Sequence, residues 1–385
     1  MPGSSLFPSS LLNLATLLLF LLVLPASAFA GSASEPILIG QSIDLSGPEG
    51  DIAKDFVTGA QTYFDKINLE GGIAGRKIRL LVSDNGGSIN EMLKNSETFL
   101  RQQKVAALFG YSGNGVVQAI SGSPVFRESG AVLIAPYSGA DIQDLPTVYF
   151  IRPDNASELL KLANFYYHLG LRKFLLIHDG AELSAGRQAE IHSQFKTWGA
   201  SLEERVIPRH PSASQLENSA RNVLQNRPEV ILLNLNTIAS AEFAKAYLTQ
   251  DASVLFGATS RVNTGTYYDL LGPARAEKTI ITQVMPQPDA MNVPVVKEHF
   301  LLMKKFRDEP PSHATLEGHV AAKLLVNALK RLPPGQITPA AIMSTLRAMN
   351  KESVGGIQLS FASQSSRGAE HVYLTYFDHR GRLQD

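Results

Sequence analysis

Short apolar runs alternate with longer stretches of helical spacing after residue 35, and few folds accommodate such an alternation. The run at 36–45 is typical of a strand, and the stretch at 51–68 places Phe56, Ala60 and Phe64 on one face of a helix. Nearly continuous apolar strands separated by helices are typical of a parallel sheet with both faces covered. The sequence therefore predicts an α/β fold built on doubly wound parallel sheets.

The alternation occurs in two successive series, which indicates two α/β lobes. Three further helices and a terminal pair of strands follow and belong to neither series. The expected strands of the first series are 36–45, 77–85, 105–111 and 131–138, with helices at 51–68, 90–103 and 115–127. Those of the second are 173–179, 203–208, 229–235, 253–259 and 279–285, with helices at 156–169, 184–198, 214–226 and 239–249. The late helices are 294–307, 313–332 and 339–349, and the terminal strands are 355–361 and 371–383.

Composition excludes several classes of function. The 385 residues include 35 basic and 35 acidic side chains, and this balance gives no electrostatic case for nucleic-acid binding. The chain has no cysteine, which excludes disulfides, thiolate metal sites and a cysteine nucleophile. Hydrophobic residues make up 44 %, enough for a buried core, and the length suggests about two domains.

The N-terminal segment 1–30 is expected to be a cleavable signal peptide. An apolar run from Leu11 to Pro25 is followed by small residues at Ala28 and Ala30, the spacing of a signal-peptidase site. The alternative is an uncleaved membrane anchor, but the apolar run is shorter than the roughly 20 residues of a spanning helix. We expect a mature chain that is exported to the periplasm and does not span the membrane.

The turn from Ser112 to Gly115 is the clearest local sign of a binding site. It joins a predicted strand to a predicted helix, so its backbone amides would favour a carboxylate or another oxyanion. The alternative is an ordinary turn that binds nothing. The loops after the neighbouring strands are also polar and rich in glycine, and ligands of open parallel sheets bind at those strand ends.

No set of catalytic or metal-binding residues emerges. His178 and Asp179 stand at a strand end, where a general-base pair is one interpretation and loop residues or a helix cap the other. The nucleophile motif G-x-S-x-G is absent, and His313 and His319 do not have the spacing of H-E-x-x-H. We expect no enzyme, no metal and no cofactor.

The chain resembles the periplasmic substrate-binding proteins of the branched-chain amino acid (Leu/Ile/Val) type, which serve ABC transporters. The resemblance rests on "IGQSIDLSGP", "INLEGGIAGRKIRLLVSDNG", "VAALFGYSGNGVVQA", "GAVLIAPYSGAD" and "TLEGHVAAKLLVNAL". It implies the type I periplasmic-binding fold, in which three crossover strands form a hinge between two lobes. By resemblance, lobe one comprises 36–152 and 283–353, and lobe two comprises 153–282 and 354–385.

The resemblance also implies a set of ligand contacts. Asn114, with the amides of Gly115 and Val116, falls where the family holds a substrate carboxylate. Family contacts also fall at Ile52, Tyr137, Ser138 and Gly139 in the first lobe, and at Leu183, Asn236 and Thr259 in the second. Amino acid binders carry an acidic residue at position 259, to pair with the ammonium, and serine or threonine at 114 and 139. Asp179 or Asp84 could replace that acid, whereas Arg261 could favour an anionic ligand.

The expected function is an exported solute-binding protein. It would capture a small polar or anionic ligand of the amino acid, amide or carboxylate class. It would then deliver that ligand, as a monomer, to the permease of an ABC importer. One alternative is a periplasmic sensing module for a receptor kinase or cyclase. A more remote one is an exported serine hydrolase that uses Ser112 or Ser138 with His178.

Overall fold

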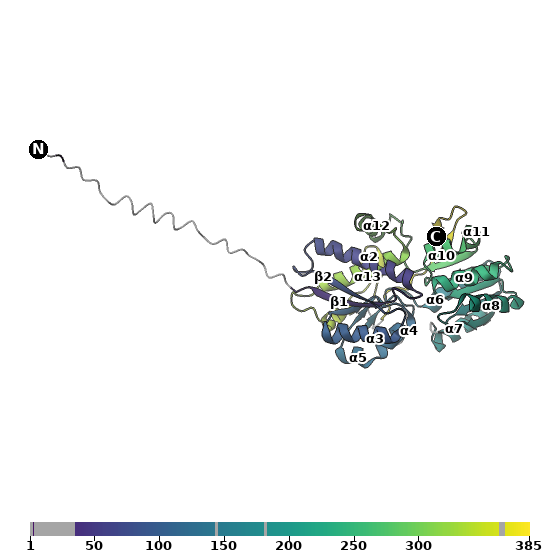
Figure 1. Cartoon of the computed structure of the whole chain (residues 1–385), viewed down its shortest axis with the longest axis horizontal. Helices are drawn as coiled ribbons and strands as arrows, with labels where there is room; N and C mark the ends of the chain where they lie inside the picture. Colours follow the sequence, from purple (N-terminus) through teal and green to yellow (C-terminus); the bar gives the residue numbers. More distant parts are fainter. Residues whose placement is uncertain (1–2, 4–34, 143–144, 181–182, 362–365) are drawn as a thin grey trace. The chain divides into compact units, whose positions relative to one another are not determined.

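The computed structural model describes Gly3 and residues 35–142, 145–180, 183–361 and 366–385. The predicted signal peptide lies outside the described residues, apart from Gly3. Two large sheets with their helices and one two-stranded hairpin make up the described chain from Pro36 onward (Figure 1). The doubly wound α/β fold expected from the sequence is confirmed.

The first sheet has five parallel strands in the order β2-β1-β3-β4-β5. We call this sheet and the helices packed on it the first lobe. Its strands are β1 (Ile37–Ile43), β2 (Ile78–Asp84), β3 (Ala107–Phe109), β4 (Leu133–Ile134) and β5 (Val148–Tyr149). Its early helices are α2 (Gly50–Leu69), α3 (Ile89–Glu97) continued by a π-helical turn (Thr98–Gln102), α4 (Asn114–Gly122) and α5 (Pro124–Ser129).

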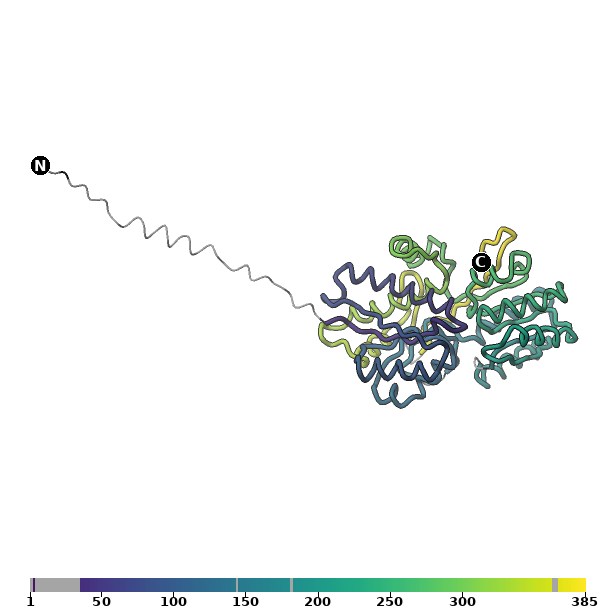
Figure 2. The backbone as a smooth tube through the Cα atoms, viewed as in Figure 1, coloured from purple at the N-terminus to yellow at the C-terminus, as the bar shows by residue number. Residues whose placement is uncertain are grey.

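Late elements of the chain complete the first lobe. They are α12 (Pro294–Phe306), α13 (His313–Lys330), α14 (Pro339–Arg347) and the hairpin of β11 (Glu352–Val354) and β12 (Ile357–Leu359). Figure 2 shows the purple and yellow-green parts of the chain side by side, and buried side chains of α2 and α13 share one core. The helices that fitted neither sequence series therefore cover the first sheet.

The second sheet has seven strands in the order β14-β13-β10-β9-β8-β6-β7, and we call it and its helices the second lobe. Its strands β6 to β10 are parallel. At one edge, β13 pairs antiparallel with β10, and β14 pairs antiparallel with β13. The strands are β6 (Lys173–His178), β7 (Ser201–Val206), β8 (Val230–Asn234), β9 (Leu255–Ala258), β10 (Thr279–Gln283), β13 (Tyr373–Phe377) and β14 (Leu383–Gln384). The helices are α6 (Asn155–His168), α7 (Ala185–Trp198), α8 (Ala213–Val223) with a 3-10 turn (Leu224–Asn226), α9 (Thr237–Leu248), α10 (Thr264–Leu271) and α11 (Pro273–Ala276).

Two local expectations were wrong. The helix expected at 115–127 is broken at Ser123, whose ψ of 142° ends α4 and caps α5, because Pro124 disfavours a helical residue before it. The two terminal runs that were expected to form a pair of strands, 355–361 and 371–383, do not pair with each other. The strand at 357–359 pairs with β11, and the strand at 373–377 pairs with β10 and β14.

The lobe boundaries taken from the resemblance stay a prediction. The buried side chains of Val354, Leu359 and Phe361 pack in the core of the first lobe. We therefore propose that the chain returns to the second lobe after Phe361. Among the described residues, no helix is both long and apolar enough to cross a bilayer.

Candidate ligand-binding site

A small cavity lies at the carboxyl ends of the first-lobe strands, and we call it the front cavity. Its empty space is about 20 Å³, the room of roughly one water molecule. Arg261, from the loop after β9 of the second lobe, closes it from the other side. The lining residues are Glu49, Ile52, Gly113, Asn114, Tyr137, Ser138, Gly139, Arg152 and Arg261.

The turn before α4 forms one wall of the front cavity. Gly113 has φ 88°, a backbone region that glycine tolerates, and its N–H donates to the carbonyl of Tyr137 at 3.1 Å. Asn114 is the first residue of α4 and is buried. The Ser138 hydroxyl donates to Asn114 Oδ1 at 2.6 Å, so the two side chains hold each other in place.

A buried network lies behind this wall and joins the two lobes. Arg152 is 1 % exposed, stacks on the Tyr137 ring at 4.1 Å, and donates to Ser260 Oγ at 2.7 Å. The Tyr137 hydroxyl donates to the carbonyl of Ser260 at 2.9 Å. Glu317 of α13 lies 3.2 Å from Arg152 Nε, and Glu158 of α6 accepts from the backbone N–H of Ser260 at 2.8 Å. These buried charges have opposite charges or hydrogen bonds beside them, as a low-dielectric interior requires.

Arg261 connects the second lobe to the first across the front cavity. Its Nη1 donates to the carbonyl of Asn234 at 2.8 Å, and its Nη2 lies 3.0 Å from Asp179 and 3.3 Å from Glu49. The side chain is 9 % exposed, so these ion pairs are poorly screened by water. A ligand anion in the cavity would compete with the two carboxylates for this guanidinium.

A second arginine of the second lobe lies over the α4 turn. A Cβ atom built on Gly113 would lie 3.0 Å from the guanidinium of Arg209, and one built on Gly115 would lie 3.2 Å from it. Arg209 is half-buried. The α4 N-terminus and the two arginines, Arg209 and Arg261, therefore favour a negative group at this place.

The structure brings together most of the first-lobe residues expected in the site. Ile52, Asn114, Tyr137, Ser138 and Gly139 all line the front cavity. Gly115 and Val116 follow directly in the first turn of α4 and are not among the residues that line it.

The three second-lobe residues of the expected site do not line the front cavity. Leu183 packs at the edge of a second-lobe core, and Asn236 caps α9 by accepting from the N–H of Ala239 at 3.0 Å. Thr259 is fully buried and donates to Asn234 Oδ1 at 2.9 Å. Their role in ligand binding stays a prediction.

Sequence reasoning missed Glu49 and Arg152 as cavity residues. Glu49 directly precedes α2, and Arg152 follows β5, so both stand at strand-to-helix junctions where polar side chains can reach the cavity. In the sequence, each of the two is a charged residue that follows an apolar run, and this pattern could have identified them as cavity residues. His178, considered for catalysis, instead faces the backbone N–H of Gly180 and Glu204. No group of three metal-ligating side chains occurs in the described parts of the chain.

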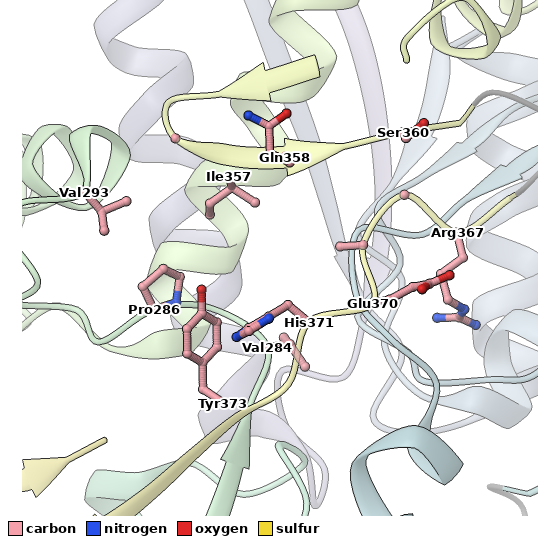
Figure 3. A pocket seen from close by; sticks show the side chains of 13 residues that line it. Val284, Pro286, Val293, Ile357, Gln358, Ser360, Arg367, Glu370, His371 and Tyr373 are labelled. Carbon is pink, nitrogen blue, oxygen red and sulfur yellow. The ribbon is translucent and has the colours of Figure 1, made fainter. Parts of the chain in front are cut away.

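A larger cavity of about 590 Å³ lies beside the segments that run between the lobes (Figure 3). Val284, Pro286, Arg367, His371 and Tyr373 are among the residues around it. Figure 3 shows these side chains on the segment after β10, on the segment before β13 and, for Tyr373, at the start of β13. None of the expected site residues lines this cavity, and most of its lining residues are partly or fully exposed, so the front cavity remains the candidate site.

Comparison with known proteins agrees with this architecture. Residues 36–382 match the profile of a family described as periplasmic binding protein. The Leu/Ile/Val-binding protein homolog 1 of Brucella suis is 25 % identical over 321 residues, which cover 79 % of this chain and 80 % of that protein.

Solved structures show the same fold. A substrate-binding periplasmic protein from Ralstonia solanacearum has a TM-score of 0.83 and 24 % identity, and the match covers 90 % of this chain and 99 % of that one. The branched-chain amino acid transporter substrate-binding protein LivJ from Streptococcus pneumoniae, in complex with isoleucine, has a TM-score of 0.74 and 18 % identity. That match covers 91 % of this chain and 98 % of that one. With two doubly wound lobes and a family match over nearly all of its described length, the chain belongs to the periplasmic binding protein family, and it is related to the Leu/Ile/Val-binding proteins.

Proposed function

We propose that this chain is an exported, non-catalytic solute-binding protein that captures a small carboxylate in the front cavity and delivers it to an ABC importer. The observation that carries the proposal is the pairing of the α4 N-terminal turn with Arg261 across one small cavity. Backbone amides at a helix N-terminus and a guanidinium both favour an oxyanion. The relatives named for leucine, isoleucine and valine also bind molecules that contain a carboxylate.

The front cavity favours a carboxylate over an α-amino acid. Thr259 stands where amino acid binders carry an acid, and its hydroxyl already donates to Asn234. Glu49, which lines the cavity, and Asp179 are the carboxylates beside it, and they lie 3.3 Å and 3.0 Å from Arg261. A buried ammonium without a free carboxylate beside it would be costly. We therefore propose a carboxylate without an α-amino group as the ligand.

Capture would use movement of the two lobes. Contacts between the lobes lie at the front cavity, and a ligand held by Asn114 from one side and by Arg261 from the other would favour the closed arrangement. The closed form would then be recognised by the permease in the inner membrane.

A calorimetric comparison tests the ligand class. Purified protein without residues 1–30 is titrated with a carboxylic acid, its α-amino analogue and its primary amide, all with the same carbon chain. We expect the carboxylic acid to bind at least tenfold more tightly than the other two, about 1.4 kcal/mol. Tighter binding of the amino acid would show that its ammonium displaces Arg261 from Asp179 or Glu49, and would overturn the preference.

Two variants test the residues. Asn114→Ala and Arg261→Gln should each weaken carboxylate binding tenfold or more. Arg221→Gln is the matched control, because Arg221 is exposed and pairs with Glu217 on the same helix at 3.0 Å. Unchanged affinity of both site variants for the carboxylate would show that the ligand does not bind in the front cavity.

Delivery to an importer is tested in cells. A strain without this chain should lose high-affinity uptake of the bound carboxylate, and normal uptake would argue for sensing.

A further inference from the structure

A second small cavity shares two walls with the front cavity, and we call it the rear cavity. Ile52 and Tyr137 line both, so the two spaces adjoin the same pair of side chains. The rear cavity has about 10 Å³ of empty space. Its other lining residues are Val262, Asn263, Thr264, Gln283, Ser312, His313 and Ala314.

His313 is a polar residue of the rear cavity whose hydrogen-bonding capacity is unused. It is 7 % exposed, and neither ring nitrogen has a hydrogen-bond partner among the described residues. Leaving both nitrogens of a buried imidazole unpaired costs free energy that a suitable partner would recover. No side chain around it serves as that partner.

Two polar neighbours of His313, Asn263 and Ser312, have hydrogen bonds to other groups. Asn263 donates to Asp55 at 3.0 Å and accepts from the N–H of Thr266 at 3.2 Å. The Ser312 hydroxyl donates to Asp55 at 2.6 Å and accepts from the N–H of Thr315 at 3.1 Å. Both ring nitrogens of His313 therefore remain available to a group that enters the rear cavity.

The imidazole is in its neutral form at physiological pH. Burial lowers the pKa of His313 to about 3. A neutral imidazole carries one N–H donor and one nitrogen acceptor. Its best partner is a neutral group that both donates and accepts, such as a hydroxyl or a primary amide. A second carboxylate would fit less well, because it accepts but does not donate.

We infer that the ligand extends past Ile52 and Tyr137 into the rear cavity and ends there in a neutral hydrogen-bonding group held by His313. This inference rests on the proposed function, which places the carboxylate of the same molecule in the front cavity. The ligand class is then a short carboxylic acid with a hydroxyl or primary amide at its far end. His313 selects that end, and Asn114 and Arg261 select the other.

The binding test uses matched ligands in isothermal titration calorimetry. Unbranched acids of three to six carbons are compared with their ω-hydroxy, ω-amide and ω-carboxylate analogues. We expect a hydroxyl or amide acid to bind at least tenfold more tightly than the unsubstituted acid of equal length. The variant His313→Phe, similar in size, should abolish or reverse that preference. Equal ratios in the wild type and in His313→Phe would overturn the inference.

A ligand-free measurement keeps the inference testable if no compound in the series binds. Replacing an unpartnered buried polar group should be neutral or stabilising, so His313→Phe should leave the melting temperature unchanged or raise it. The matched control is His299→Phe. His299 is also buried, at 0 % exposed, but its Nε2 bonds Thr315 Oγ1 at 2.9 Å, so its loss should lower the melting temperature. A clear drop in His313→Phe would show a structural role and overturn the inference.

The two failures are distinguishable. If no carboxylate binds the wild type, the proposed function fails whatever His313 does. If carboxylates bind but show no preference at the far end, the proposed function stands and the role of His313 fails.

Discussion

At the scale of single residues, a polar side chain at a strand end either lines the cavity or bonds to neighbouring protein groups. The sequence alone does not distinguish these two uses. Asn114 and Asn236 both stand at the start of a helix after a parallel strand. Asn114 lines the front cavity, whereas the side chain of Asn236 caps α9. Thr259 is likewise bound to Asn234. The first-lobe contacts could be predicted from strand-end positions, but the use of each side chain depends on neighbours from other elements.

Gly139 illustrates a residue whose identity is dictated by one neighbour. A Cβ atom at this position would lie 1.7 Å from Asn155 Oδ1 and 2.9 Å from the backbone nitrogen of Asn155. We expect Gly139→Ala to lower the free energy of unfolding by about 1–3 kcal/mol, as overpacked cores do. Urea denaturation would measure this. Gly122→Ala is the control, because nothing lies within 4 Å of its Cβ, and equal stability of the two variants would contradict the prediction.

Two buried histidines should make the fold sensitive to acid. Burial lowers the pKa of His299 and of His313 to about 3, whereas an unfolded histidine titrates near pH 6.5. Between these values the unfolded chain binds more protons, so stability falls as the pH falls from about 6.5 to 3. Each histidine contributes up to about 1.4 kcal/mol per pH unit.

Urea denaturation at several pH values checks this dependence. In His313→Phe the free energy of unfolding should fall less steeply between about pH 6.5 and 3, because unfolding of this variant should take up close to one proton fewer. His379→Asn replaces an exposed histidine and should keep the wild-type slope. An unchanged slope in His313→Phe would mean that this imidazole is protonated in the folded chain.

At the scale of elements, the sequence predicted most helices and strands but not how the late ones pair. In the sequence, the run that forms β13 reads as an ordinary terminal strand. It pairs antiparallel with β10 because the edge of β10 is open to a further strand. Such pairing is non-local, so no local pattern encodes it. The break at Ser123 differs, since Pro124 was visible in the sequence and marks the end of α4.

Two glycines allow α2 and α13 to pack closely. A Cβ on Gly59 would lie 1.8 Å from the carbonyl oxygen of Thr315, and one on Gly318 would lie 2.0 Å from that of Phe56. Gly59→Ala should push the helices apart and lower the free energy of unfolding by about 2 kcal/mol or more. Gly186→Ala, in the open first turn of α7, should be neutral or mildly stabilising. Thermal denaturation showing the same melting temperature for both variants would refute this packing argument.

At the scale of the whole chain from Pro36 onward, α2 connects the first lobe to the second. Glu49, directly before α2, lies 3.3 Å from Arg261, and Asp55 of α2 accepts from Asn263 at 3.0 Å. Both contacts join acidic groups near the start of one helix to the loop after β9. We therefore expect closure of the lobes to depend in part on these polar contacts, of which Glu49 also lines the front cavity.

Removing these contacts should favour an open arrangement. Loss of a partly buried hydrogen bond or ion pair costs about 1 kcal/mol or more, so Glu49→Ala combined with Asp55→Ala should shift the closed-to-open ratio by tenfold or more. Small-angle X-ray scattering should then give a larger radius of gyration. Asp65→Ala is the control on the same helix, since Asp65 pairs with Arg307 inside the first lobe. An unchanged radius in the double variant would show that other contacts hold the lobes.

The contact between Gly139 and Asn155 also restricts the order in which this site can change during evolution. A serine or threonine at 139, as in the amino acid binders, would collide with Asn155, which is fully buried at the start of α6. A smaller residue at 155 must therefore come first, and the reverse order passes through a damaged intermediate. The two substitutions should show sign epistasis, so the order in which positions 139 and 155 change is constrained.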